Sequence, residues 1–172
     1  MIRKIITYPD PLLTQVAKSV IHITDEIRTL LNDMAETMYA GEGVGLAAPQ
    51  VAVGLRAIVI DVDVEAGEKG PGLLKMVNPE IVAGDGEIEW EEGCLSVPDF
   101  RIKIKRKGHL RVKYLTENGE EIFLECEGLL AVAVQHEIDH LDGKLIIDDA
   151  SRLKRDLYRR KLRKKHTEDI DF

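Results

Sequence analysis

The chain has 172 residues, of which 44% are hydrophobic and 32% charged, and a formal net charge of −7. This length suits one domain with a good core, and no repeat or boundary divides residues 1–172. No apolar run approaches the roughly 20 residues of a membrane span. Residues 1–6 lack a signal-peptide core, and the two cysteines do not indicate a disulfide framework. We therefore exclude a membrane protein and expect a cytoplasmic one.

The N-terminal part of the chain carries helix signals. Asp10 and Pro11 can open a short helix that reaches Val16, because Asp caps helices and Pro suits the first helical position. After Thr24, apolar residues recur at helical spacing, which predicts an amphipathic helix ending near Ala40. The residues on its apolar face are Ile27, Leu30, Leu31, Met34 and Met38.

A short segment with two glycines, Gly43-Val44-Gly45, follows this helix. It is consistent either with an ordinary turn or with a site where another backbone approaches closely. Gly45 can adopt backbone angles that other residues avoid. A nucleotide-binding loop is excluded, because neither a preceding strand nor a third glycine completes that pattern.

Strand signals fill the middle of the chain. Residues 56–62 are typical of a buried strand, and residues 67–72, with Pro71, of a loop. Alternating runs at 109–115 and 121–125 flank Asn118-Gly119, which is a strong hairpin signal. These strands, arranged around a buried helix near the C-terminus, predict an antiparallel α+β architecture.

That buried helix covers residues 129–141, which are apolar almost all round, and Gly143 suits a left-handed cap after it. Its sequence contains His136-Glu137-Ile138-Asp139-His140. Histidines four residues apart lie on one helix face and can bind one metal ion. Glu137 beside them can take a proton from water, as in hydrolytic H-E-x-x-H sites.

A catalytic metal of this kind usually has three protein ligands. Two familiar positions for the third do not fit, since Ile146 stands where a third histidine is needed and Glu168 lies in the tail. The upstream candidates are Cys94 and Cys126. Cys126 ends an alternating strand pattern and is typical of a small core residue, which favours Cys94.

Three segments, in order, carry a family resemblance: GVGLAAPQ at 43–50, EGCLS at 92–96 and QHEIDHLDG at 135–143. They are the signature motifs of peptide deformylases, and the chain resembles a bacterial-type member over nearly its whole length. The resemblance implies a central metal-binding α-helix enclosed by three antiparallel β-sheets. It also implies removal of the formyl group from the N-terminal formyl-methionine of newly synthesised polypeptides, with release of formate.

The resemblance further implies roles for individual residues. Cys94, His136 and His140 would hold one divalent metal, natively Fe(2+), with Zn(2+) or Ni(2+) as substitutes. Glu137 would move the proton, while the Gln50 amide and the Leu95 backbone N–H stabilise the developing negative charge. The substrate-binding residues would be Gly43, Val44, Gly45, Trp90, Arg101, Leu129, Val132 and Ala133.

Parts of this substrate site have a simpler interpretation. Leu129, Val132 and Ala133 have the spacing of one helix face, but such residues can equally be core. Arg101 would engage the substrate backbone or belong to the polar face of an exposed strand. Two other functions remain open: a metallopeptidase that cleaves unblocked peptides, and a non-catalytic ribosome-binding protein.

The C-terminal segment is strongly basic. Residues 151–166 contain nine Lys or Arg and one Asp, a local charge of +8, so the remainder carries −15. A helix starting near Ser151 would have Leu153, Leu157 and Leu162 packed on the domain. Its basic face would be solvated, or would dock on ribosomal RNA, which attracts positive charge. We expect no DNA or membrane partner.

Overall fold

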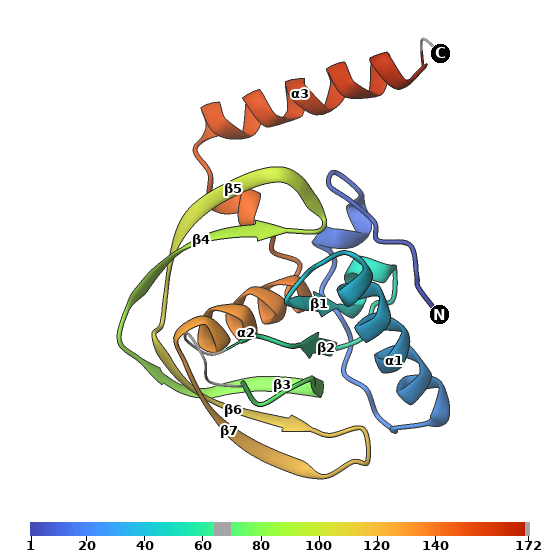
Figure 1. The fold of residues 1–172 in the computed structure, drawn as a ribbon, viewed down its shortest axis with the longest axis vertical. Helices are drawn as coiled ribbons and strands as arrows, with labels where there is room; N and C mark the ends of the chain where they lie inside the picture. The colour runs from blue at the N-terminus through green and yellow to red at the C-terminus, as the bar shows by residue number, and fades with distance from the viewer. Residues whose placement is uncertain (64–69, 171–172) are drawn as a thin grey trace.

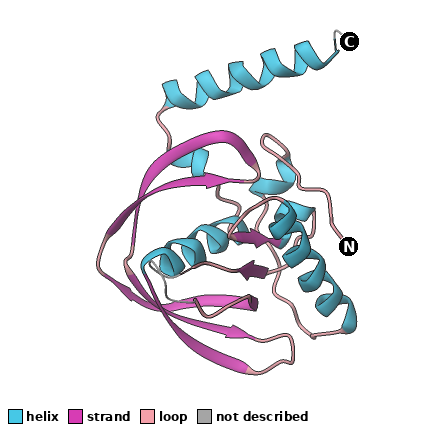
Figure 2. Cartoon of the chain, in the orientation of Figure 1, coloured by secondary structure: helices cyan, strands magenta, loops and turns pink. Residues whose placement is uncertain are grey.

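The computed structural model describes residues 1–63 and 70–170. Within them lie three α-helices, seven β-strands and three short 3-10 helices, arranged as an α+β fold (Figures 1 and 2). None of the described helices combines the length and the apolar character needed to cross a membrane. The predicted loop at 67–72 falls partly outside the described residues.

Two antiparallel sheets frame the molecule. The larger has five strands in the spatial order β1-β2-β3-β6-β7, and the smaller is the pair β4-β5. The strand bounds are β1 Gly45–Ala47, β2 Ala57–Ile60, β3 Leu74–Asp85, β4 Ile88–Cys94, β5 Val97–Arg106, β6 His109–Leu115 and β7 Glu121–Glu127.

The expectation of three separate sheets is wrong for the described residues. Strand β3 has 12 residues and pairs with β2 over Leu74 to Val77 and with β6 over Val77 to Asp85. Register shifts follow Val77 and Ile81, so irregular pairing bends this long strand. One strand therefore joins two groups that would otherwise be separate sheets.

Helix α2, Gly128–Leu141, lies between the sheets (Figure 1). It matches the predicted buried helix, and its apolar residues pack with Ile58, Met76 and Val112 of the larger sheet. Gly143 follows in the left-handed region at φ 75°, as expected for a cap. A side chain there would also clash with the backbone oxygen of Thr14. The predicted metal-binding motif is thus carried on a buried helix.

Helix α1, Asp25–Ala40, begins after the predicted cap Thr24, whose side chain accepts from the Ile27 amide. All five predicted apolar positions are buried. The predictions for two short segments are confirmed in part. A 3-10 helix covers Pro11–Thr14 rather than reaching Val16, and β2 occupies the centre of the strand predicted at 56–62. The predicted 109–125 hairpin is present as β6 and β7.

Helix α3, Arg152–Ile170, leaves the body beyond the two-stranded sheet (Figure 1). The prediction of its apolar contacts was wrong at two positions, since Leu153 and Leu157 are 70% and 53% exposed. Tyr158 is buried in their place, and Leu162 is partly buried against the same cluster. The helix also continues beyond His166, so Glu168 is helical rather than frayed.

Candidate metal centre

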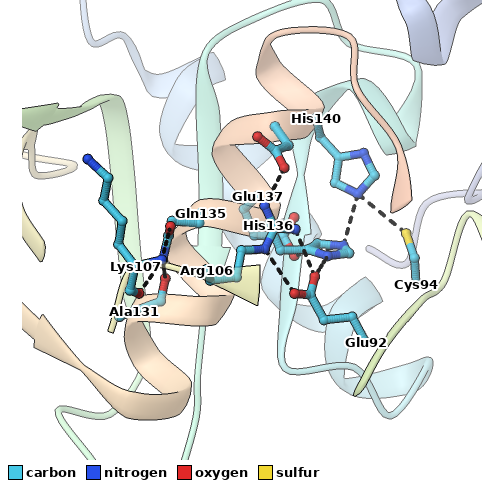
Figure 3. Close-up of polar contacts among 10 residues, drawn as sticks. Glu92, Cys94, Arg106, Lys107, Ala131, Gln135, His136, Glu137 and His140 are labelled. Atoms are coloured by element: carbon cyan, nitrogen blue, oxygen red, sulfur yellow. Dashed lines mark hydrogen bonds and ion pairs between the residues drawn. The ribbon is translucent and has the colours of Figure 1, made fainter. Parts of the chain in front are cut away.

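Three potential metal ligands converge where α2 passes the end of β4. The Cys94 Sγ lies 3.3 Å from Nε2 of His140, which lies 3.2 Å from Nε2 of His136 (Figure 3). The two histidines are one helical turn apart on α2, and Cys94 is the last residue of β4. Cys126, the other cysteine, is fully buried in the main core instead.

This donor set fits a divalent metal ion. Tetrahedral bonds of about 2.0–2.3 Å place neighbouring nitrogen and sulfur donors roughly 3.3–3.6 Å apart, close to the separations seen here. A thiolate and two imidazoles are also typical zinc or iron donors. Two facing imidazole nitrogens need either a proton or a cation between them, and a divalent cation also satisfies the Cys94 sulfur, so the geometry suits an ion at this point.

The ring of His136 is oriented by a hydrogen bond on the nitrogen that faces away from the other two donors. Its Nδ1 lies 2.9 Å from Oε1 of Glu92. Arg106 donates one hydrogen bond to each oxygen of the same carboxylate. Burial acts to raise the pKa of Glu92, but the bonds from Arg106 and His136 outweigh it and lower that pKa. The ionised carboxylate accepts from Nδ1–H, which leaves the Nε2 lone pair facing the other two donors.

Glu137 lies beside the donors in a buried position. Its side chain is 4% exposed, and its Oε2 has no hydrogen-bond partner among the described residues. Burial is the main reason that its pKa rises to about 7. A carboxylate with a pKa near neutrality can both accept and return a proton at physiological pH.

Gly45 is needed for close approach rather than for unusual backbone angles. Its φ is not in the left-handed region, so that part of the prediction was wrong. A Cβ built on Gly45 would lie 2.5 Å from Oε1 of Glu137. The glycine-containing segment therefore passes directly against the carboxylate.

Gln50 is buried at the same centre. Its Nε2 donates to Oγ of Ser96 at 3.0 Å and lies 3.6 Å from Sγ of Cys94, while its Oε1 accepts from the Ala47 amide. Ser96 in turn donates to the Ile6 carbonyl. These bonds hold the side-chain amide of Gln50 towards the metal donors.

A cavity of about 640 Å³ opens beside these groups. Cys94, His136 and Glu137 lie at its inner end, and His140 is buried behind them. Every residue expected to bind substrate or stabilise charge lines it, namely Gly43, Val44, Gly45, Gln50, Trp90, Leu95, Arg101, Leu129, Val132 and Ala133. Trp90 and Val44 are 42% and 48% exposed, so they lie near the mouth.

The comparisons with known proteins agree with this geometry. The family model described as Polypeptide deformylase matches residues 2–156. The chain belongs to this family. The peptide deformylase of Syntrophobacter fumaroxidans is 48% identical over 161 residues, 94% of each chain. Crystal structures of the enzymes from Ehrlichia chaffeensis and Legionella pneumophila superpose with TM-scores of 0.92 and 0.88, at 37% and 46% identity, covering 98–99% of both chains.

As a peptide deformylase, the chain is a metal-dependent hydrolase that removes the N-terminal formyl group from newly synthesised polypeptides. The signature segments of its sequence, 43–50, 92–96 and 135–143, all meet at the cavity. An Ehrlichia chaffeensis relative, 40% identical, has been crystallised in complex with actinonin. The α+β fold with its internal helix agrees with these solved deformylase structures.

Sequence reasoning missed the partners of the deformylase centre. Arg106 bonds Glu92 on one side and Asp139 on the other, at 2.6 Å, and its side chain is only 9% exposed. In the sequence it ends the run Arg101-Ile-Lys-Ile-Lys-Arg, which is typical of an exposed strand face. The available signal was indirect: a metal-bound histidine needs an acceptor for its second nitrogen, and Glu92 stands two residues before Cys94.

Proposed function

We propose that Cys94, His136 and His140 hold one divalent metal ion and that Glu137 is the proton-transfer group beside it. The observation that carries this assignment is the convergence of three donor atoms next to a buried, partly unpartnered carboxylate. Nε2 of His140 lies 3.3 Å from the Cys94 sulfur and 3.2 Å from Nε2 of His136, and all three atoms lie within 4.8 Å of one another. A divalent ion there supplies Lewis-acid chemistry, which polarises a carbonyl and lowers the pKa of water. We further propose that residues 1–172 act as one catalytic domain.

Fe(2+) is our proposed native metal, with Zn(2+) or Ni(2+) able to substitute. A single thiolate with two imidazoles accepts all three ions, so availability rather than affinity selects among them in a cell. The thiolate of Cys94 is also open to oxidation, and it is only partly buried. We expect an iron-loaded protein to lose activity in air faster than a nickel-loaded one.

The residues around the cavity divide the hydrolysis between them. Glu137 takes the proton from the attacking water and returns it to the departing amine of methionine. The Gln50 amide donates to Oγ of Ser96 and to Sγ of Cys94. The N–H on Cys94 is the one that turns to the oxygen that gains negative charge, while the N–H on Ser96 stays in place. The backbone N–H of Leu95, next to Cys94, donates to the same oxygen.

The substrate peptide is proposed to lie along residues 43–45. Strand β1 ends the five-stranded sheet of the described residues, so its outer edge can accept an added strand. The methionine side chain then packs in the cavity against Leu129, Val132 and Ala133 of α2, and Val44 and Trp90 lie at the cavity mouth. Arg101, on the opposite strand β5, reaches the peptide backbone.

A peptide series tests this function. The purified protein should release formate from formyl-Met-Ala-Ser, release nothing from acetyl-Met-Ala-Ser, and leave unblocked Met-Ala-Ser intact. Cleavage of the unblocked peptide would indicate a metallopeptidase instead. Absence of any hydrolysis by protein with stoichiometric metal would contradict catalysis by this centre.

We also propose that α3 docks the enzyme on the ribosome, in the cytoplasm, where formylated nascent chains emerge. The support is the local charge of +8 over 151–166 and the exposure of Arg160, Arg163 and Lys164. Arg159 is less suitable, because it donates to the Tyr8 hydroxyl at 2.6 Å and so holds α3 to the body. Phosphate contacts by the exposed cations would give salt-dependent binding.

Charge reversal separates docking from catalysis. A variant with Arg160→Glu, Arg163→Glu and Lys164→Glu should hydrolyse a short formyl peptide normally, because these residues lie outside the cavity. It should co-sediment with ribosomes less than the parent at low salt, and the difference should shrink as salt rises. Equal, salt-insensitive sedimentation of both proteins would make α3 a solvated structural helix.

A further inference from the structure

A side-chain hydrogen bond joins two residues on either side of the proposed peptide-binding segment in the chain. The Tyr39 hydroxyl lies 2.5 Å from Oδ2 of Asp61, a residue 22 positions later in the chain. Tyr39 belongs to the last turn of α1, and Asp61 follows the end of β2. The pair therefore joins the end of α1, which leads into the turn at 41–44, to the residue that follows β2.

Asp61 holds this turn through its backbone as well. Its amide donates to the Val44 carbonyl at 2.9 Å. Val44 lies one residue before β1, where the regular pairing of Gly45 with Ile60 begins. The position of Val44 thus depends on where Asp61 lies, while Gly45 is fixed independently by the strand ladder.

The same turn is confined from the cavity side. Gly43 donates to the Met38 carbonyl at the end of α1, and a Cβ on Gly43 would lie 2.9 Å from Cδ1 of Leu95. Glu42 is in the left-handed region at φ 56°, a conformation that non-glycine residues adopt only when the surroundings hold them. The turn at 41–44 has little room on the Leu95 side, so its position is sensitive to loss of the contact with Asp61 on the other side.

We propose that Tyr39 and Asp61 form a positioning pair that sets the peptide-binding edge at Val44. The inference rests on the proposed docking of the peptide along residues 43–45. Neither residue lines the cavity, so both act through Val44 rather than by touching substrate. Hydrogen bonding to Asp61 is the main cause that raises the pKa of Tyr39 to about 12, so the Tyr39 hydroxyl keeps its proton at ordinary pH.

The pair should affect binding more than chemistry. In Tyr39→Phe, the ring remains and only the hydroxyl is lost, so Asp61 is less restrained. We expect KM for formyl-Met-Ala-Ser to rise roughly three- to tenfold, the usual effect of one lost hydrogen bond. We expect kcat to stay within about twofold, because the β1–β2 ladder still places Gly45 against Glu137.

Three comparisons separate positioning from simple structural support. Tyr8→Phe removes a tyrosine hydroxyl that bonds Arg159 away from the cavity, and its KM should match the parent. Asp61→Asn retains an acceptor for Tyr39 and should recover most of the binding lost in Asp61→Ala. In the Asp61→Ala background, Tyr39→Phe should have no further effect on KM.

Peptide length provides the deciding measurement. The parent should bind formyl-Met-Ala-Ser more tightly than formyl-methionine amide, because the longer substrate has more backbone along 43–45. Tyr39→Phe should shrink that difference. If the parent shows no length dependence, the proposed docking edge fails and the positioning pair with it. If the parent shows it and Tyr39→Phe retains it in full, the pair alone is overturned.

Discussion

Gly45 joins the proposed substrate edge to Glu137, the proposed proton-transfer group. A Cβ at this position would lie 2.5 Å from Oε1 of Glu137. The strand ladder fixes the backbone of Gly45, so the carboxylate, which lines the cavity, would have to move. The sequence predicted close approach at this segment, but by another backbone rather than by the Glu137 side chain, and it predicted unusual angles at Gly45 that the structure does not have. The relevant contact joins residues 92 positions apart, which no local pattern reveals.

Gly45→Ala should therefore lower kcat roughly 10- to 100-fold, since small misplacements of a catalytic group have effects of that size. Bound metal should remain stoichiometric, because the three donors are not displaced. Gly54→Ala is the matched control, as a Cβ there meets nothing within 4 Å. Steady-state kinetics with metal analysis would check the prediction, and a parent-like kcat in Gly45→Ala would contradict the close approach.

Glu92 is a second residue whose effect is indirect. Glu92→Gln keeps the side-chain size but removes the charge that accepts from His136 and pairs with Arg106. Loss of such an orienting group typically weakens metal binding 10- to 100-fold. The neighbouring Glu91→Gln, an exposed position, should leave affinity unchanged. Competition with a chelator measures the metal affinity of both variants. Equal metal affinities in Glu92→Gln and Glu91→Gln would show that the Glu92 bond does not orient His136.

At the scale of elements, the sequence predicted those whose pattern is local. Helices α1 and α2 have clear helical periodicity or an uninterrupted apolar run, and the β6–β7 hairpin has an Asn-Gly turn. Strand β3 was not predicted, because its register shifts break the alternation of buried and exposed side chains. Arg106 was missed for a related reason, since its burial depends on contacts with β4 and α2 that are distant in sequence.

Helix α3 provides a prediction at this scale. Tyr158 is buried, stacks edge-on with Phe100 at 5.3 Å and donates to the Pro98 carbonyl. Tyr158→Ala should lower the free energy of unfolding by about 3 kcal/mol, as for other buried aromatic truncations. Leu157→Ala should change it by less than about 0.5 kcal/mol, because Leu157 is exposed. Urea denaturation measures the free energy of unfolding of both variants. Similar losses in the two would contradict the prediction that Leu157 is exposed and Tyr158 is buried.

At the scale of the whole molecule, charge is separated along the chain. The basic segment at 151–166 lies on a helix that extends from the body, while the remaining residues carry −15 (Figure 1). Composition alone revealed this division, but not which cations are free to act. Arg159, Arg160 and Arg163 are all exposed, but Arg159 is also bonded to Tyr8.

The three sequence motifs contain the residues that meet at the candidate metal centre, because each motif is short and its chemistry is local. Their arrangement required the fold: the larger sheet supplies the 43–50 segment, the smaller sheet supplies Cys94, and α2 between them supplies the histidines. The central claim is that this assembly hydrolyses a formyl amide with Glu137 as its proton-transfer group.

The most direct test is formate release by Glu137→Gln protein whose metal content has been measured in the same sample. Glu137 is not one of the three converging donors, so the variant should retain one metal ion per chain. Its kcat on formyl-Met-Ala-Ser should fall by at least about 100-fold, because acid–base catalysis is lost. Near-parent turnover by a fully metal-loaded Glu137→Gln protein would contradict the account.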